Sequence, residues 1–377
     1  MRLTKYIIFL INFGSDSSQD VIVKLLYLTN GICGCGGLER ILSIKTSHFI
    51  SQQQHDIAII RLNEQRRTPF FDFHPDIRFY DIELGTANKL SRYWVYMKAV
   101  ARAVQDYQPD IIFVCDDGVK GLFVPLWLKT KAKLVYERHA SLGFNNTPVA
   151  VQKLMRKAVR LYDAFVVLTP SCKQDWGNST NIHVIANPLP HIPEQSSPLN
   201  TQRAICVGSL SHNKGYDLLI EALARIKDVP WQIEIYGRGD PSQLRAQALQ
   251  LGVSLNQLQF KGESQQIDQA YQHADFLILP SRTEGFGMVL IEAMAYGVPC
   301  VAFDCPNGPR YIVDDQDNGF LAKAADPEDL AEKIQTMLTL SISQRQQMGR
   351  QAKHTSQRYL VDHIGDQWQQ LFSQLHH

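Results

Sequence analysis

The feature that most constrains the fold is an alternation of short apolar runs and helix-patterned segments, which continues from residue 24 to the C-terminal end. Runs such as IIFVC (111–115) and FLILP (276–280) are apolar at nearly every position. Parallel strands buried on both faces have this pattern, whereas half-exposed strands alternate apolar and polar residues. Repeated β-α units of this kind predict a parallel sheet with helices on both faces.

The alternation falls into two blocks, separated by a Pro- and Ser-rich segment at residues 191–201. Predicted strands cover residues 24–30, 57–62, 111–115, 133–137, 164–169 and 183–187 in the first block, and 204–210, 232–237, 258–262, 276–280 and 298–303 in the second. A chain of 377 residues is long for one core. We therefore predict an α/β chain of two doubly wound domains, with a ligand cleft at the carboxyl ends of the strands.

The predicted domains are residues 24–190 and 202–355, joined by the linker 191–201. Residues 342–374 have a helical pattern, and we expect the terminal helix, 356–377, to cross back to the first domain. Residues 1–23 are predicted to lie outside the fold. Their apolar stretch is too short to span a bilayer, and a start codon placed too early would explain them. A signal peptide is the alternative, although no small-residue cleavage site follows.

The composition excludes several classes of protein. Apolar residues make up 45% and charged residues 20% of the chain, an ordinary globular mixture. The net charge of +1 hides an asymmetry, since residues 24–190 hold 21 Lys and Arg against 14 Asp and Glu, and residues 191–377 hold 15 against 21. No basic segment is interleaved with aromatic residues, so we expect no nucleic acid as a partner. Seven cysteines without a CxxC pair favour a reducing cytoplasm.

The segment SRTEGFGMVLIEAMAYGVP (281–299) carries the clearest chemical signal. A buried strand ends at Pro280, a glycine-containing loop follows, and a helix begins near Gly287. Free backbone amides and the positive end of that helix would hold a phosphate. Of the two carboxylates, Glu284 and Glu292, one can accept from both hydroxyls of a ribose and the other can bind a sugar ring. Two solvated glutamates beside a helix start are the alternative.

This segment resembles the glutamate-x7-glutamate motif of the retaining glycosyltransferases of family 4, which have the GT-B fold. The wider stretch LPSRTEGFGMVLIEAMAYGVPCVAFDCPNGP is also similar to that family, as are VGSLSHNKGYDLLIEAL (207–223), IYGRG (235–239) and, more weakly, GGLER (36–40). The resemblance runs from about residue 24 to the end of the chain. It implies two Rossmann-like domains that face each other across a cleft.

The resemblance also implies roles for individual residues of this segment. Glu292 would bind the ribose of a donor, and Glu284 would contact the donor sugar near the reacting centre. Backbone amides of Gly285, Phe286 and Gly287 would bind the sugar and the diphosphate.

Lys214 matches the family lysine that neutralises the leaving diphosphate. A cation there stabilises the charge that develops as the glycosidic bond breaks. An ordinary surface lysine is the alternative. The family's usual arginine, five residues before the lysine, is Ser209 in this chain. Arg282 or Arg238 could take its place, since both flank the predicted cleft.

Two residues of the first block are further candidates. The loop GICGCGG (31–37) does not match GxGxxG, but in the family this loop faces the diphosphate, so Gly37 is a candidate contact. A tight turn without a ligand is the alternative. His139, in YERHAS (136–141), follows a predicted strand, and a buried core histidine is the default interpretation. The family places a histidine there near the donor sugar, where it could donate a hydrogen bond or exchange a proton with the acceptor.

Signals for a metal are poor. Asp315 and Asp317 form a DxD string, but they lie in VDDQDNGF, which is typical of a polar turn. We expect no obligatory metal and no cofactor apart from the donor substrate.

Four basic residues share one face of the predicted helix at 148–162 through their i, i+3, i+4, i+7 spacing: Lys153, Arg156, Lys157 and Arg160. A solvated charged face is one interpretation. Docking on an anionic membrane surface is the other, which the basic balance of this half favours.

The sequence therefore predicts a retaining glycosyltransferase. By resemblance, it would move a hexose or N-acetylhexosamine from a nucleoside-diphosphate sugar to a glycan, such as a lipid-linked saccharide of bacterial capsule, exopolysaccharide or lipopolysaccharide synthesis. It would act in the cytoplasm, at the inner membrane surface. A nucleotide-sugar epimerase of the same architecture is one alternative, although it would lack this loop. A non-catalytic nucleotide-sugar-binding protein is another, which the joint presence of Glu284, Lys214 and Glu292 disfavours.

Overall fold

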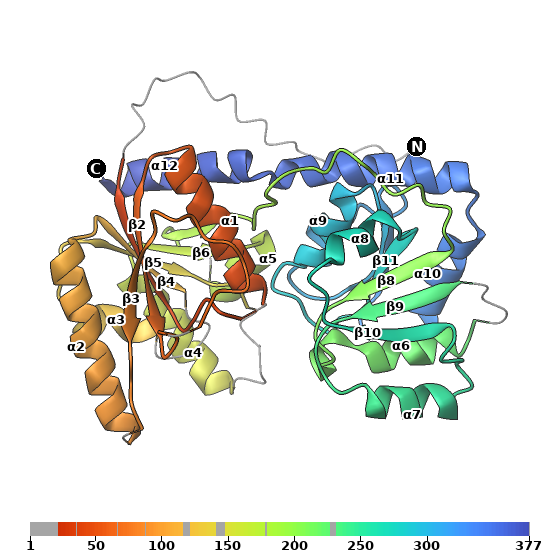
Figure 1. Cartoon of the computed structure of the whole chain (residues 1–377), viewed down its shortest axis with the longest axis horizontal. Helices are drawn as coiled ribbons and strands as arrows, with labels where there is room; N and C mark the ends of the chain where they lie inside the picture. The colour runs from red at the N-terminus through yellow and green to blue at the C-terminus, as the bar shows by residue number, and fades with distance from the viewer. Residues whose placement is uncertain are drawn as a thin grey trace.

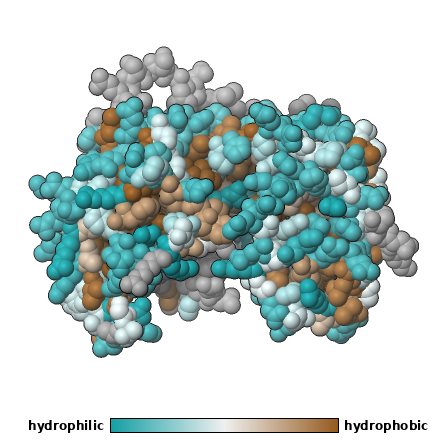
Figure 2. Space-filling view, viewed as in Figure 1, coloured by the Kyte–Doolittle hydropathy of each residue, from teal (hydrophilic) through white to brown (hydrophobic). Residues whose placement is uncertain are grey.

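The computed structural model describes residues 22–34, 36–65, 67–86, 88–115, 121–140, 148–177, 179–226 and 231–376. Within these ranges the chain forms two domains side by side, each a parallel sheet covered by helices (Figure 1). The predicted α/β class with two doubly wound sheets is confirmed. In the space-filling view the domains form two lobes, with a notch between them on the lower side (Figure 2).

The first sheet has seven strands in the order β3-β2-β1-β4-β5-β6-β7, all parallel. Its strands are β1 (Lys24–Thr29), β2 (Asp56–Leu62), β3 (Arg78–Ile82), β4 (Ile111–Cys115), β5 (Lys133–Glu137), β6 (Ala164–Val167) and β7 (Ile182–Val184). The helices of this domain are α1 (Gly37–Ser51), α2 (Lys89–Tyr107), α3 (Val124–Trp127), α4 (Val149–Ala158) and α5 (Pro170–Trp176).

The second sheet has six parallel strands in the order β10-β9-β8-β11-β12-β13. Its strands are β8 (Arg203–Val207), β9 (Gln232–Tyr236), β10 (Leu258–Gly262), β11 (Phe276–Leu279), β12 (Cys300–Asp304) and β13 (Gly319–Lys323). The helices are α6 (Tyr216–Leu223), α7 (Ser242–Gln250), α8 (Ile267–Gln272), α9 (Met288–Ala295), α10 (Pro327–Thr339) and α11 (Ile342–Ser356).

Both sheets reverse their strand order near the middle. The first reverses between β1 and β4, and the second between β8 and β11. Ligands in open α/β sheets bind outside the carboxyl ends of the strands at such a reversal, because the neighbouring connections run to opposite faces and leave a crevice. The two crevices belong to the segments after β1 and β11, which hold Gly37 and Glu284.

Each sheet has a hydrophobic core on both faces. Residues of α2, α3 and α4 pack on one face of the first sheet, and residues of α1 and of the last helix, α12 (Val361–His376), pack on the other. In the second domain α6, α7 and α10 cover one face, while α8, α9 and α11 cover the other. Burial on both faces is the reason why the predicted strands are apolar at consecutive positions.

Two edge strands, β3 and β13, differ from the prediction, which had no strand at either position. β3 has the sequence RFYDI, and four of its five residues are half-buried or exposed. It has one neighbouring strand and less burial, so it lacks the continuous apolar run that identified the central strands. β13 (GFLAK) is largely buried, and its sequence directly follows a predicted polar turn.

The C-terminal region also differs, because the predicted helical stretch 342–374 is broken into α11 and α12. At this break the chain pairs with the segment that leads from the first domain into the second. Leu189 N donates to Tyr359 O at 2.6 Å, and Val361 N donates to Leu189 O at 2.8 Å. The chain therefore crosses between the domains twice, side by side. After the second crossing α12 lies against α1 of the first domain (Figure 1).

Residues 1–21 of the predicted N-terminal extension lie outside the described residues. Val23, which was expected to belong to that extension, is part of the first domain. Its side chain is buried in the same cluster as α12, and its amide donates to His55 Nδ1 at 3.3 Å. The fold thus includes one residue before the predicted boundary.

Trp368 of α12 offers a test of how far the last helix stabilises the first domain. Its ring is buried and packs edge-on against Phe113 of β4, with ring centroids 5.4 Å apart. Trp368→Ala should lower the free energy of unfolding by about 3–5 kcal/mol, because it leaves a large cavity. Urea unfolding of the full chain measures this. Leu249→Ala, at a side chain that is 63% exposed, is the control and should change stability by about 0.5 kcal/mol at most.

Candidate functional site

The loop between β11 and α9 begins the site. Gly287 stands at the N-cap of α9 with φ +97°, a left-handed conformation that favours glycine. Because Gly287 has no side chain, it cannot cap the helix, so the first-turn amides and the positive helix end stay open to a partner. Phe286 anchors the loop, since its buried ring packs edge-on against Tyr359 with centroids 5.5 Å apart.

A second loop, at the start of α6, brings Lys214 to the first. Gly215 has φ +66°, and a Cβ atom there would lie 2.0 Å from Pro280 O, so a side chain cannot be accommodated. Two hydrogen bonds hold the loops together: Arg282 N donates to Asn213 O at 2.8 Å, and Asn213 Nδ2 donates to Thr283 O at 2.9 Å.

As a result, Lys214 and Glu284 form an ion pair, with Lys214 Nζ 2.6 Å from Glu284 Oε1. Their side chains are 22% and 10% exposed, so the pair is partly shielded from solvent. The structure thus joins two of the predicted site residues next to the open end of α9. An incoming anionic group would share Lys214 with Glu284.

Glu292 lies further along α9 and is buried. Tyr271 OH of α8 donates to Glu292 Oε2 at 2.8 Å, and Arg40 of α1 forms an ion pair with Oε1 at 3.0 Å. Burial, followed by the nearby Glu292 charge, holds the pKa of Tyr271 well above its usual value, so the phenol remains a donor. Arg40 comes from the first domain, so this pair joins the first turn of α1 to α9 across the domain boundary.

His139 meets the same loop from the first domain. A Cβ atom on Gly285 would lie 2.0 Å from His139 O, so the two backbones touch across the domain boundary. The His139 ring is turned inward: Nε2 lies 3.2 Å from Glu137 Oε1, and the side chain is 8% exposed. Its backbone borders the site, and its ring belongs to a buried polar cluster.

The cluster behind His139 includes Glu137, the last residue of β5, and Lys45 of α1. Lys45 Nζ donates to both carboxylate oxygens of Glu137. Burial would raise the pKa of Glu137, but the Lys45 ammonium and the neighbouring His139 outweigh it and lower that pKa to about 2.

Arg282 has a different partner from the one expected. Its guanidinium forms two hydrogen bonds to the carboxylate of Asp217, at 2.7 and 2.6 Å, and a third to His212 O at 2.7 Å. It therefore fastens the β11–α9 loop to α6. Ser209, at the position of the missing family arginine, bonds through its hydroxyl to Ser211 at 3.3 Å. A contact between Arg282 and a diphosphate stays a prediction.

Gly37 is the first residue of α1, and a Cβ atom there would meet nothing within 4 Å. The Glu64 carboxylate holds the loop before Gly37, because it accepts hydrogen bonds from Ile32 N at 2.7 Å and Cys33 N at 3.2 Å. Gly37 therefore borders open space on the first-domain side, near Arg40.

The predicted membrane-docking residues lie elsewhere. Lys153, Arg156 and Lys157 are exposed on α4, and Arg160 is exposed just after it. The buried side of this segment packs on the sheet face opposite α1. Arg156 Nε also donates to Asp175 O at 2.6 Å. The structure does not bring these residues together with the donor-site residues.

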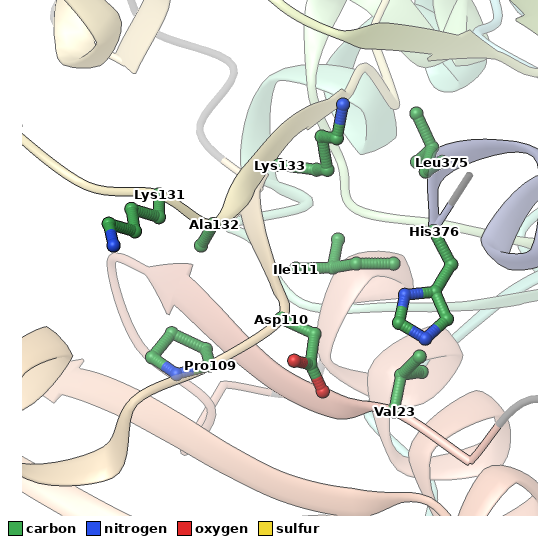
Figure 3. A pocket seen from close by; sticks show the side chains of 9 residues that line it. All are labelled: Val23, Pro109, Asp110, Ile111, Lys131, Ala132, Lys133, Leu375 and His376. Atoms are coloured by element: carbon green, nitrogen blue, oxygen red, sulfur yellow. The ribbon is translucent and has the colours of Figure 1, made fainter.

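The cavity of Figure 3 is not part of this site. It is lined by residues at the amino ends of β4 and β5 and by the end of α12, including Asp110, Lys131 and His376. Asp110 has a structural role, because its carboxylate accepts a hydrogen bond from Lys24 N at 2.7 Å. The amino ends are the edge of a parallel sheet where ligands do not usually bind.

The remaining candidate groups are potential metal ligands, the Asp315–Asp317 string and the cysteines. In the described part of the chain, no three His, Cys, Asp or Glu side chains are placed to hold a metal ion. Asp315 Oδ1 accepts from Leu321 N at 2.9 Å, and Asp317 N donates to Asp314 O, so the DxD string is part of a turn. The six described cysteines form no disulfide with one another and are buried. None of the described helices is both long and apolar enough to cross a bilayer.

Sequence reasoning missed Arg40, Tyr271, Lys45 and Glu137 at this site. Arg40 and Glu137 stand in the quoted segments GGLER and YERHAS, but a single sequence holds no signal that pairs them with Glu292 or Lys45. Such pairs depend on which helix faces which strand end.

Known proteins resemble the chain in both halves. Residues 36–191 match the family model described as Glycosyltransferase Family 4, and residues 191–355 match the one described as Glycosyl transferases group 1. An uncharacterized glycosyltransferase of Haemophilus influenzae is 27% identical over 355 residues, covering 92% of this chain and 98% of the relative. The amylovoran biosynthesis glycosyltransferase AmsD of Erwinia amylovora is 26% identical, covering 79% and 85%.

A solved structure, HepE of Anabaena in complex with UDP and glucose, shares the fold. It has a TM-score of 0.77 and 20% identity, and the match covers 93% of this chain and 100% of that one.

Two glycines of the site offer a matched test of the domain contact. In Gly285→Ala the added methyl group would overlap the backbone carbonyl of His139, so the domains must shift apart. We expect a loss of about 1–3 kcal/mol in the free energy of unfolding, the usual cost of overpacking. Gly37→Ala meets no atom and should be neutral or stabilising by up to about 1 kcal/mol, because alanine favours the helix. Equal stabilities for the two variants would contradict the close contact.

Proposed function

The chain belongs to the glycosyltransferases of family 4, which have the GT-B fold, and from that premise we propose its reaction. It transfers a hexose or N-acetylhexosamine from a nucleoside-diphosphate sugar to a hydroxyl group of a glycan, with retention at the anomeric carbon. The observation that carries this proposal is the Lys214–Glu284 pair beside the open end of α9.

The donor diphosphate would lie at the start of α9. Backbone amides of Gly285, Phe286 and Gly287 and the positive helix end stabilise a phosphate there. Lys214 adds a mobile cation that follows the charge onto the leaving diphosphate as the bond to the sugar breaks. Glu284, with Oε1 2.6 Å from Lys214 Nζ, would bind a hydroxyl of the donor sugar.

The ribose of the donor would bind at Glu292. A carboxylate has about four lone-pair sites, so Glu292 can accept from ribose hydroxyls in addition to Tyr271 and Arg40. The solved relative from Anabaena was crystallised with UDP and glucose. A uridine diphosphate hexose is therefore the first donor to test.

Retention is proposed through attack on the face that the leaving group vacates. The anomeric carbon–oxygen bond to the diphosphate breaks, the acceptor oxygen forms the new bond, and its proton passes to the departing diphosphate. Glu284 is a poor covalent nucleophile here, because its charge is neutralised by Lys214. The reaction as written needs no obligatory metal.

The names of the relatives support a proposal for the acceptor class. The Erwinia amylovora relative acts in amylovoran biosynthesis by its name. We propose a saccharide of a bacterial surface polysaccharide, held in the membrane by a lipid diphosphate, as the acceptor. The basic face of α4 would then dock the first domain on the anionic inner leaflet.

The reaction is tested with a panel of UDP-, GDP- and ADP-hexoses and an undecaprenyl-diphosphate-linked saccharide. Mass spectrometry detects an acceptor that gains one sugar, NMR assigns the new anomeric centre, and EDTA in parallel reactions should leave the rate unchanged. Isomerisation of the donor sugar without an acceptor would instead show an epimerase. An inverted linkage would refute the proposed retention.

Glu284→Gln should reduce turnover by about 100-fold or more, because a contact made in the transition state is lost. Steady-state rates with saturating donor measure the effect. Glu332→Gln, at an exposed carboxylate on α10, is the control and should keep the wild-type rate. A Glu284→Gln rate within about threefold of wild type would place this residue outside the site.

The docking face is tested by co-sedimentation with vesicles that contain anionic lipid. Each basic residue near an anionic surface contributes about 1 kcal/mol, so four give reversible binding that salt of roughly 0.5 M should abolish. Changing Lys153, Arg156, Lys157 and Arg160 to Gln should remove the binding.

The control variant changes four exposed basic residues of the second domain to Gln, namely Arg225, Arg245, Lys261 and Arg350. It has the same net charge as the α4 variant, so retained binding in this control alone assigns docking to α4. Equal loss in both variants would show that net charge decides, and α4 would then be an ordinary solvated face.

A further inference from the structure

A buried polar cluster lies directly behind the site, at the carboxyl edge of the first sheet. Glu137 ends β5, Cys115 ends β4 with its Sγ 3.5 Å from Glu137 Oε2, and Lys45 reaches both carboxylate oxygens from α1. His139 follows two residues after Glu137, and its carbonyl touches Gly285 of the donor loop. The cluster therefore connects the core of the first domain to the proposed donor site.

The three titratable side chains are almost completely shielded from water. Lys45 is 1% exposed, Glu137 3% and His139 8%. Aromatic rings surround the ammonium group: the ring centroids of Tyr27 and Phe113 lie 5.3 Å from Lys45 Nζ, and that of Trp368 lies 4.4 Å away. In such surroundings an uncompensated charge would be very costly, so the Lys45 and Glu137 charges depend on each other.

Stability alone does not account for this arrangement. A buried ion pair can often be replaced by apolar side chains of similar size with little loss, or with a gain, in stability. The sheet around the cluster is otherwise apolar, as Val135 and Phe113 are. His139 offers another explanation for the Lys45–Glu137 pair, because Glu137 Oε1 lies 3.2 Å from His139 Nε2.

A carboxylate beside one ring nitrogen of histidine fixes where the proton resides. It favours a proton on Nε2, which leaves Nδ1 as the acceptor of a neutral ring. Lys45 balances the charge of Glu137, which keeps the buried carboxylate in position beside the ring. Among the described residues, Cys115 and Tyr27 are further titratable groups near the carboxylate. Burial raises the pKa of Tyr27, and the Glu137 charge adds to this effect.

We propose that Glu137 is a positioning residue for sugar transfer, which holds His139 as the Nε2–H tautomer at the donor loop, and that Lys45 makes this possible by balancing its charge. The proposal rests on the proposed function, together with the role towards the donor sugar that the family resemblance implies for His139. The part that concerns the tautomer stands on the geometry of the first domain alone.

The tautomer is measured directly by NMR of the full chain labelled with 15N-histidine, using correlations between ring nitrogens and ring carbon-bound protons. Comparison with His139→Gln identifies the His139 signals. We expect the Nε2–H tautomer in the wild type and a changed tautomer pattern in the apolar double variant Lys45→Met/Glu137→Leu. A wild-type Nδ1–H tautomer, or an unchanged pattern in the double variant, would overturn the proposal.

Kinetics test whether the pair acts through His139. The double variant should lose about tenfold or more in kcat, with the donor KM within about threefold of wild type, because only the ring position is disturbed. When His139→Gln is already present, adding Lys45→Met/Glu137→Leu should cost less than about threefold further. Losses that multiply would overturn the proposal, since they would show a purely structural pair.

Two controls separate this result from general damage. Arg61→Met/Asp81→Leu removes another ion pair, which joins β2 to the edge strand β3, and should keep the wild-type kcat. Calorimetry with uridine diphosphate shows whether each variant still binds donor nucleotide. If Lys45→Met/Glu137→Leu does not fold, Lys45→Leu/Glu137→Met, which also removes both charges and the acceptor oxygens, is measured by the same NMR and kinetic readouts with the same expectations. A wild type that transfers no sugar would refute the proposed function and leave the NMR result valid.

Discussion

The site depends on one close contact between the domains, where the carbonyl of His139 lies against Gly285 without room for a Cβ atom. The contact brings the carboxyl edge of the first sheet to the loop that begins α9, so residues of both domains border the same space. A second contact, the Arg40–Glu292 ion pair, has side chains 25% and 7% exposed, and partial burial strengthens its attraction. A β-bridge between Leu189 and Leu360 joins the two segments that cross between the domains, and so it also holds the two domains in their relative position. The geometry of the site is thus a property of the domain pair.

Four carboxylates at the site are paired with a basic side chain before any substrate is considered. Among the described residues these pairs are Glu284–Lys214, Glu292–Arg40, Asp217–Arg282 and Glu137–Lys45. A nucleoside diphosphate would add negative charge to this neutral set. Its stabilisation would have to come from the open amides of α9 and from a cation that can change partners. Lys214 is suited to that change because its side chain is partly exposed and flexible, whereas Lys45 is enclosed by aromatic rings.

The sequence predicted the buried parts of the fold well, because burial on both faces leaves a continuous apolar run in strands such as β4 and β5. The edge strand β3 had no such run and was missed, and β13, although largely buried, was missed because it directly follows a polar turn. The meeting of Lys214 with Glu284 was predictable from the family resemblance, and the structure adds the reason, a left-handed turn at Gly215. The partner of Arg282 and the pairs of Arg40 and Lys45 were not predictable. Each depends on a tertiary contact between elements distant in the chain, which leaves no periodic pattern.

The last helix shows how the stability of the first domain and the geometry of the site are connected. The ring of Trp368 fills the core beside Phe113, and the same ring lies 4.4 Å from the ammonium of Lys45. The next residue, Gln369, accepts through Oε1 a hydrogen bond from His55 Nε2 at 2.9 Å, since His55 Nδ1 already accepts from Val23 N. This bond fastens α12 to the loop before β2. The cluster around Glu137 is thus shielded from solvent by α12, which returns from the second domain and covers it. A buried carboxylate keeps its charge and position only in such a closed environment, with its cation fixed beside it. The second crossing of the chain thus contributes to the position of a residue at the cleft as well as to the core.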